Sequence, residues 1–350
     1  MTDDRSGEIQ TAPSAQHVVL CTDLDATIAH YTEQLGFRLE MIMPADAPRI
    51  ALLSGDRITV RLEVRDDRDA PVVLPEAAPE FVITRAEAAD AWVAGRAGMQ
   101  YRDLIPKRLG GRIIASHIRI PDGGPVPDYV HYHKVGFQMI YCKRGWVRVV
   151  YEDQGRPFVM HAGDCVLQPP TIRHRVLEAS PGLEVIEIGS PAEHETWRDH
   201  SLELPTAQLR PDRLFGGQRF VRHIAADAVW QRNEHAGCNF RDTGISQATD
   251  GLASVRVLRV TPSADAERNN LARQIQDGDF LFLLLLDGRL GLISHALGTH
   301  ALDVGDACVI PQGADYALDA RLPADVLAVA LPQLDRSMQR EQPTIPAVLA

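Results

Sequence analysis

Two histidines, His131 and His133, stand one residue apart at the start of the stretch HYHKVGFQMIYCKRG. On a β-strand, side chains at i and i+2 point to the same face, so this pair is suited to hold a metal ion from one strand. Alone the pair is a weak indication, because the chain has 13 histidines and a buried histidine can also be satisfied by hydrogen bonds. Gln138 follows where a carboxylate would complete a metal site.

The larger, C-terminal part of the sequence indicates an all-β architecture. Short apolar runs such as GRIIASHIRI, GWVRVVY and LEVIEIG alternate with Gly, Pro and Asp turns, which is typical of a β-sandwich or barrel. A second set of such runs covers residues 253–332. The segment AGDCVLQPPTIRH aligns with VGDACVIPQGADY, which places Gly163 on Gly305 and Asp164 on Asp306. This internal repeat predicts two barrels.

The stretches PDYVHYHKVGFQMIYCKRG and GDCVLQPPTIRH resemble the two sequence motifs of the cupin family. The matching positions are His131, His133 and Gly145 in the first motif, and Gly163, Pro169 and His174 in the second. Thr171 stands where the family often has glycine, and Glu178 where it often has asparagine. The resemblance implies a double-stranded β-helix barrel in which His131, His133 and His174 converge on a divalent metal. Fe(II) is the metal expected first, with Zn, Ni, Mn and Cu as alternatives, since neutral imidazoles suit all of them.

Gln138 departs from the family pattern, in which this position is usually a glutamate. An amide cannot take up a proton near neutral pH, so it is a poor general base. It also leaves the metal site one negative charge short, which favours an anionic bidentate ligand from solution. Three-histidine cupins, such as thiol, β-diketone-cleaving and gentisate-type dioxygenases, are similar in this respect. Two other interpretations stay open: Gln138 binds the metal through its amide oxygen, or it only packs.

Four further residues are predicted to contact substrate. Gln168, just before a proline, and Arg173, beside the third histidine, are candidates for orienting it. Arg173 should nevertheless point away from the barrel interior, because neighbouring strand residues alternate. Tyr129 and Tyr141 are candidates for the mouth of the site, with packing as the alternative.

Other titratable residues near the motifs are expected to have structural roles. Glu187 and His194, in EVIEIGSPAEHETW, are interpreted as members of surface ion pairs. Cys142 and Cys165 are interpreted as small buried core residues rather than nucleophiles.

The second repeat carries no good set of metal ligands. The positions that align with the ligand set of the first repeat are Gln274, Gln276, Leu281 and Tyr316. We therefore expect the second barrel to be a metal-free scaffold or half of a dimer contact.

Residues 17–64 predict a strand, a helix and further strands. Their pattern DL…YxxxLGF, seen in TDLDATIAHYTEQLGFRLE, resembles one βαβββ module of the glyoxalase/bleomycin-resistance family. Such modules supply metal ligands at positions that correspond here to His17 and Glu63. Because a second module does not follow, we expect both residues to be structural and the module to serve interaction or dimerisation.

The fold class predicted is therefore mainly β, two cupin barrels preceded by a small α+β module. The predicted division is a glyoxalase-like module over 1–66, a linker with a helix over 67–108, a metal-binding cupin over 109–197, a connector over 198–252, a degenerate cupin over 253–335 and a tail over 336–350.

Composition excludes several function classes. The net charge of −11 argues against nucleic acid or an anionic membrane surface as a partner. The polar N-terminal stretch lacks the apolar core of a signal peptide, and five scattered cysteines fit a reducing compartment. We expect a cytoplasmic homodimer.

The resemblance implies an Fe(II)-dependent bicupin oxygenase that acts with O2 on a small chelating organic substrate. Two alternatives stay open. One is a metal-dependent isomerase, lyase or hydrolase in which the ion acts only as a Lewis acid. The other is a non-catalytic cupin sensor that binds a small molecule.

Overall fold

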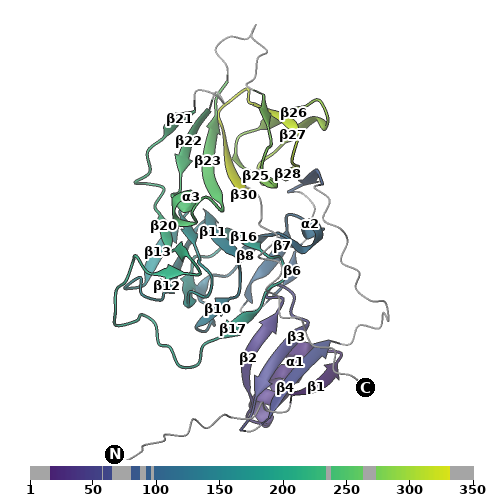
Figure 1. Cartoon of the computed structure of the whole chain (residues 1–350), viewed down its shortest axis with the longest axis vertical. Helices are drawn as coiled ribbons and strands as arrows, with labels where there is room; N and C mark the ends of the chain where they lie inside the picture. Colours follow the sequence, from purple (N-terminus) through teal and green to yellow (C-terminus); the bar gives the residue numbers. More distant parts are fainter. Residues whose placement is uncertain are drawn as a thin grey trace, which may run out of the picture. The chain divides into compact units, whose positions relative to one another are not determined.

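The computed structural model describes residues 16–56, 58–64, 80–86, 92–95, 98–233, 238–262 and 273–331. The chain divides into two compact units, one of Met1–Pro71 with Glu195–Arg198 and the other of Val72–His194 with Asp199–Ala350. Both are built mainly of strands, as predicted (Figure 1). Within the described ranges, no helix is long and apolar enough to cross a membrane.

The first unit has the βαβββ order predicted from the sequence. Its elements are β1 (Gln16–Cys21), α1 (Leu24–Ala29) continued by the π-helical turn η1 (His30–Gln34), β2 (Arg38–Met43), β3 (Ile50–Ser54), β4 (Thr59–Val64) and β17 (Thr196–Arg198). Strand β1 pairs in parallel with β4, and β3, β2 and β17 follow by antiparallel pairing. The Asp23 carboxylate caps α1 by accepting a hydrogen bond from the Ala26 N–H at 2.9 Å.

His17 and Glu63, the positions where modules of the resembled family carry metal ligands, were expected to be structural. His17 is exposed on β1, and Glu63 is ion-paired with Arg61. In the part of the chain that the structure describes, no cluster of metal-ligating side chains includes either residue.

The second unit contains two β-barrels, each made of a short and a long sheet. In the first barrel the short sheet has the order β13 (Phe158–His161), β12 (Trp146–Tyr151), β15 (His174–Ala179), β10 (His131–His133), with β9 (Gly124–Pro125) beside β15. Its long sheet has the order β20 (Val221–His223), β14 (Cys165–Leu167), β11 (Phe137–Arg144), β16 (Leu183–Ser190), β8 (Ile114–Ile120), β7 (Gln100–Asp103), β6 (Val93–Ala94).

The second barrel repeats this plan. Its short sheet has the order β24 (Gln274–Ile275), β29 (Asp315–Asp319), β26 (Leu290–Ser294), β27 (Gly298–Leu302). Its long sheet has the order β21 (Gln231–Asn233), β22 (Cys238–Asp242), β23 (Ser254–Val260), β30 (Ala324–Leu331), β25 (Phe280–Asp287), β28 (Ala307–Ile310), β5 (Val82–Thr84). The remaining elements are α2 (Arg108–Gly111), α3 (Ile245–Ala248) and the hairpin β18 (Leu214–Phe215) to β19 (Gln218–Arg219).

Matching details in the two barrels support the internal repeat. The carboxylate of Asp164 accepts hydrogen bonds from two backbone N–H groups, and that of Asp306 does the same after the equivalent strand. Strand β11 has a bulge between Cys142 and Arg144, and β25 has one between Leu285 and Asp287. Each barrel therefore kept the turn and the bulge that shape its sheet.

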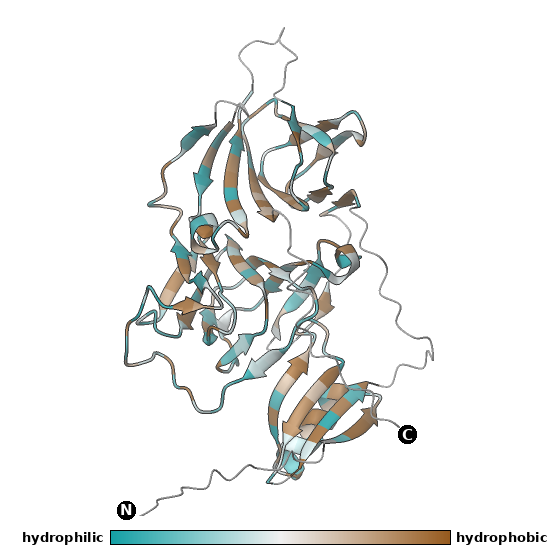
Figure 2. Cartoon of the chain, viewed as in Figure 1, coloured by the Kyte–Doolittle hydropathy of each residue, from teal (hydrophilic) through white to brown (hydrophobic). Residues whose placement is uncertain are grey.

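The long sheets of the two barrels share one hydrophobic core. Phe137 and Met139 of β11 lie in it together with Phe280 and Phe282 of β25, and all four are fully buried. Hydrophobic and polar bands alternate along β23 in Figure 2, as expected for a strand with two different faces. Because Phe137 and Met139 face the core between the barrels, the residues of β11 that alternate with them point into the first barrel.

Two described stretches of the segment predicted as a linker, 67–108, belong to the barrels. Strand β5 pairs with β28 of the second barrel, and β7 pairs with β8 of the first. The helix predicted within this linker is wrong at Val93–Ala94, which form the strand β6; residues 87–91 and 96–97 lie outside the described ranges. The predicted boundary at 66 and the predicted tail over 336–350 also lie outside them. The predicted connector, 198–252, gives β20 to the first barrel and β21 and β22 to the second.

Candidate metal centre

The three histidines of the cupin-like motifs converge inside the first barrel. His131 and His133 come from β10, and His174 begins the neighbouring strand β15, directly opposite His131. All three side chains are buried, and one ligand atom from each lies within 4.8 Å of the others. In the ranges that the structure describes, no other group of three His, Cys, Asp or Glu side chains comes together in this way.

Backbone carbonyls fix the orientation of two of these rings. His131 Nδ1 lies 2.8 Å from the Tyr129 carbonyl oxygen, and His174 Nδ1 lies 3.1 Å from that of Ile172. A carbonyl only accepts, so Nδ1 carries the proton and Nε2 keeps its lone pair for a metal. Such outer contacts are typical of metal-binding histidines. The donor set therefore fits a divalent transition metal, as the sequence predicted.

Gln138 faces the histidines from the opposite sheet and is held at both ends of its amide. Its Nε2 donates to Glu187 Oε1 at 2.6 Å, and its Oε1 accepts from Gln168 Nε2 at 3.0 Å. The Tyr151 hydroxyl in turn donates to Gln168 Oε1 at 2.6 Å. Because a carboxylate only accepts hydrogen bonds, Glu187 fixes the donor and the acceptor in each of these three hydrogen bonds. The amide of Gln138 is thus held in place by its neighbours.

Glu187 is half-buried, whereas the sequence-based interpretation placed it on the surface. On β16 it alternates with Ile186 and Ile188, which lie in the core between the barrels, so its side chain points into the first barrel. It pairs across strands with Ile140, two residues from Gln138 on the same face. A carboxylate from the neighbouring strand therefore lies against Gln138, outside the cluster of the three histidines.

His194 is buried, whereas the sequence-based interpretation placed it on the surface. It is 6% exposed, and its ring centroid lies 5.3 Å from that of His133. Its Nδ1 lies 3.0 Å from the Pro191 carbonyl oxygen, the same kind of contact that orients His131 and His174. His194 therefore lies beside the three-histidine cluster.

Tyr151 is a further residue of this site that the sequence did not single out. Its ring stacks on His174 with a centroid distance of 5.4 Å and an interplanar angle of 22°. Burial, together with the nearby charge of Glu187, raises the pKa of Tyr151, so its hydroxyl stays protonated and donates. A buried aromatic residue carries no local motif, which is why the sequence gave no signal for it.

The four predicted substrate contacts divide into two pairs. Tyr129 is half-buried with its ring centroid 5.7 Å from that of His131, and Gln168 is bound to Gln138, so both lie at the site. Tyr141 does not, because it lies on the other face of β11 in the core between the barrels. Arg173 points away from the interior, as its position beside His174 predicted.

The outward contacts of Arg173 are an ion pair and a ring. Its Nε donates to Asp199 Oδ2 at 3.1 Å, and its guanidinium lies 4.4 Å from the centroid of the Tyr132 ring. Burial alone would raise the pKa of Asp199, but hydrogen bonds from Leu202, Ser201 and Arg173 lower it to about 2. Arg173 therefore holds the segment around Asp199, which follows the barrel, through this ion pair.

Both cysteines near the site are core residues, as expected. Cys142 and Cys165 are fully buried, and burial raises the pKa of Cys142 to about 12. Neither is suited to act as a nucleophile near neutral pH.

The second barrel has the same positions with different residues. Gln274 pairs with Tyr316 just as His131 pairs with His174, which confirms the equivalence taken from the sequence repeat. No Cys, His, Asp or Glu occupies the equivalent positions, which are Gln274, Gln276, Leu281 and Tyr316.

Comparisons with known proteins agree with the barrel architecture. Residues 116–187 match the family model of the cupin domain. A deletion variant of oxalate decarboxylase from Bacillus subtilis aligns with 70% of this chain and 76% of its own, with a TM-score of 0.50 and 14% sequence identity. The formate complex of oxalate decarboxylase from Lactobacillus farciminis aligns with 70% of this chain and 84% of its own, with a TM-score of 0.49 and 13% identity. The comparison with curated proteins found no match. Residues 116–187 thus match the cupin domain, and the chain has a bicupin fold similar to that of the Bacillus subtilis protein.

Proposed function

We propose that this protein is a divalent-metal-dependent bicupin oxygenase, with Fe(II) as its metal, that acts on a small chelating organic anion. The observation that carries the proposal is the buried cluster of His131, His133 and His174, with its ligand atoms within 4.8 Å of one another. Three neutral imidazoles leave the charge of a divalent ion uncompensated, which favours an anionic chelating substrate. When bound, the ion supplies a Lewis-acid centre for that substrate and the electron that O2 requires.

The residues around the cluster position the substrate and limit the proton chemistry. Gln138 cannot titrate, so it presents a fixed dipole on the side facing the histidines. Glu187 carries the carboxylate on this side, and the hydrogen bond from Gln138 Nε2 orients it. Tyr129 lies beside His131, where its ring can contact a bound substrate. The apolar residues of the barrel interior exclude water from the reacting centre.

A second candidate function is a metal-dependent proton-transfer reaction, such as decarboxylation or isomerisation, without O2. The specific observation in its favour is the carboxylate of Glu187 inside the barrel, where it can give or take a proton. The similar fold of the Bacillus subtilis oxalate decarboxylase is consistent with this candidate.

One set of measurements separates the two candidates. The metal content of protein purified without added metal is measured first. Metal-free protein is then loaded without air with Fe(II), Mn(II) or Zn(II), and O2 uptake is followed with diketones, thiols and hydroxyaromatics, while CO2 release is followed with dicarboxylates. The oxygenase proposal predicts O2 uptake with the Fe(II) form and a chelating substrate. Tightly held zinc together with no O2 uptake from any of these substrates contradicts it.

The variant Glu187→Gln sharpens this test. In the proton-transfer candidate the variant loses turnover almost completely while its metal content stays unchanged, because the acid–base group is gone. In the oxygenase proposal it keeps measurable O2 uptake. Tyr141→Phe is the matched control, since Tyr141 lies between the barrels and its change leaves both activities intact.

A further inference from the structure

The interior of the second barrel contains a cavity of about 140 Å³. Seven aliphatic side chains from β23, β25, β29 and β30 form most of its wall, and five polar or sulfur-bearing residues complete it. This cavity lies apart from the three-histidine cluster, in the barrel that lacks metal ligands. A ligand bound in this cavity would therefore be distinct from the substrate of the proposed function.

The cavity occupies the positions that hold the metal centre in the first barrel. Gln274 and Tyr316 line it, and they are the register equivalents of His131 and His174. The Tyr316 hydroxyl donates to Gln274 Oε1 at 2.8 Å, so the two side chains are joined where two imidazoles stand in the other barrel. In the second barrel, a hydrogen-bonded pair of side chains therefore occupies the positions of two histidines of the first barrel's candidate metal centre.

The charged and amide side of the first site is apolar in the second. Leu281 pairs with Ala330 as Gln138 pairs with Gly189, and Ala328 occupies the position of Glu187. Leu281, Ala328 and Ala330 all line the cavity. Exchanging a carboxylate for a methyl group leaves space and removes charge, and both changes suit an uncharged, compact ligand body.

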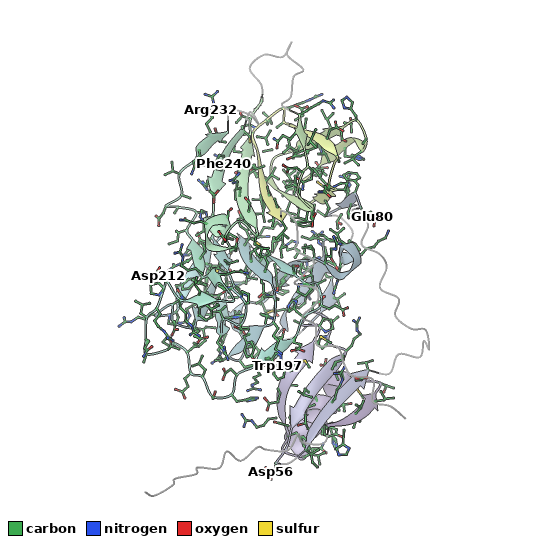
Figure 3. The ribbon with its side chains drawn as sticks, in the orientation of Figure 1. Asp56, Glu80, Trp197, Asp212, Arg232 and Phe240 are labelled. Carbon is green, nitrogen blue, oxygen red and sulfur yellow. The ribbon has the colours of Figure 1, made fainter. Side chains whose placement is uncertain are left out.

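A cation lies at the wall of this cavity. Arg256 of β23 lines it, and its side chain is 42% exposed, so the guanidinium reaches from the cavity towards solvent. Its Nε donates to Asp242 Oδ2 at 3.1 Å, and its guanidinium lies 4.9 Å from the ring centroid of Phe240, labelled in Figure 3. Arginine has five N–H donors, so donors remain for a second anion beside Asp242.

The size of the cavity limits the ligand. An apolar cavity of about 150 Å³ in another protein holds one benzene molecule, so a volume of about 140 Å³ fits a single ring or a short branched chain. Arg256 recognises a carboxylate, and the paired Tyr316 and Gln274 form a polar point on the wall. We propose that the second barrel binds a small monocarboxylic acid with one ring or a short branched chain, without a metal ion.

Calorimetric titration of the full-length, metal-free protein with benzoate tests this proposal, with benzyl alcohol as the uncharged counterpart. We expect one benzoate per chain. Ala328→Leu fills the cavity and should weaken benzoate binding at least about tenfold, since the added side chain takes the space of the ring. Arg256→Gln should weaken benzoate by a similar factor and leave benzyl alcohol nearly unchanged.

The first barrel supplies the matched control. His174→Gln alters the metal cluster and should leave benzoate binding unchanged. Ala328→Val fills less of the cavity and replaces Ala328→Leu if circular dichroism shows that the latter is unfolded. Absence of saturable benzoate binding up to about 10 mM overturns the proposal. So does binding that His174→Gln abolishes and that neither substitution at Ala328 changes.

Discussion

Replacing Gln138 by glutamate tests the charge arrangement of the first barrel. In the native chain Gln138 Nε2 lies 2.6 Å from Glu187 Oε1, and Gln138 is 1% exposed. Glutamate has the same shape, so Gln138→Glu sets two carboxylate oxygens at nearly this separation. Two unit charges that close repel by about 6 kcal/mol at an effective dielectric constant of about 20. The pair relieves part of this repulsion by holding one proton, so we expect the metal-free variant to lose about 2–4 kcal/mol near pH 7.

The pH dependence of this loss follows from the shared proton. A carboxyl whose folded pKa is raised above its unfolded value of about 4.3 destabilises the fold as pH rises from that value through the folded pKa. The deficit of Gln138→Glu should therefore be small near pH 5 and grow towards pH 8. Gln138→Leu is the matched control, because Leu281 stands at the equivalent position of the second barrel. It loses the amide hydrogen bonds without adding charge, so its deficit should change little with pH.

The assay is urea unfolding of the metal-free proteins at several pH values between about 5 and about 8, with extrapolation to water. A deficit of Gln138→Glu that is the same at both ends of this range refutes the charge argument. A deficit no larger than that of Gln138→Leu at the upper end also refutes it.

Three further predictions follow from local geometry. Thr171 has a backbone φ of +63°, so Thr171→Gly should raise the unfolding free energy by about 1 kcal/mol in urea unfolding, and Thr171→Ala by less. A hydrogen bond from His117 lowers the pKa of Glu184 to about 2 from 4.5 against the opposing effect of burial. The ionised Glu184 carboxylate adds about 2 kcal/mol to the unfolding free energy; this contribution is complete above about pH 4.5 and is lost as pH falls towards 2. The difference in unfolding free energy between native protein and Glu184→Gln should therefore shrink over that interval. Of the five thiols, only Cys21 should react rapidly with a disulfide reagent in the folded protein, because Cys142 and the other three are buried; rapid labelling of Cys142 contradicts this.

The convergence of the three histidines and the presence of the barrels were predictable from the sequence because their signals are local. His131 and His133 share one short strand, and His174 ends a motif with its own turn and proline. The βαβββ order of the first unit was predictable for the same reason, since Asp23 caps its helix and Gly36 follows it with a φ of +71°. Each of these features depends on a few consecutive residues.

The features that the sequence did not predict depend on pairing between distant strands. Glu187 reaches Gln138 through the register of β16 on β11, and a shift of one residue would have pointed it away from the barrel. Strand β5 is three residues long and pairs with β28, more than two hundred residues later in the sequence, so no local pattern assigns it to a barrel. Tyr141 is the exception: it is an odd number of residues from Gln138, and strand alternation alone would have placed it on the other face.

The metal content of three purified forms tests the central claim most directly. The three forms are native protein, His174→Gln and His223→Gln. His223→Gln is the control, because His223 is a buried histidine of the same barrel outside the cluster. Each form is dialysed against one divalent metal, and the number of metal ions per chain is measured. The structure predicts one ion per chain in the native protein and in His223→Gln, and almost none in His174→Gln. A full ion retained by His174→Gln, or two ions per native chain, would contradict a single three-histidine centre in the first barrel.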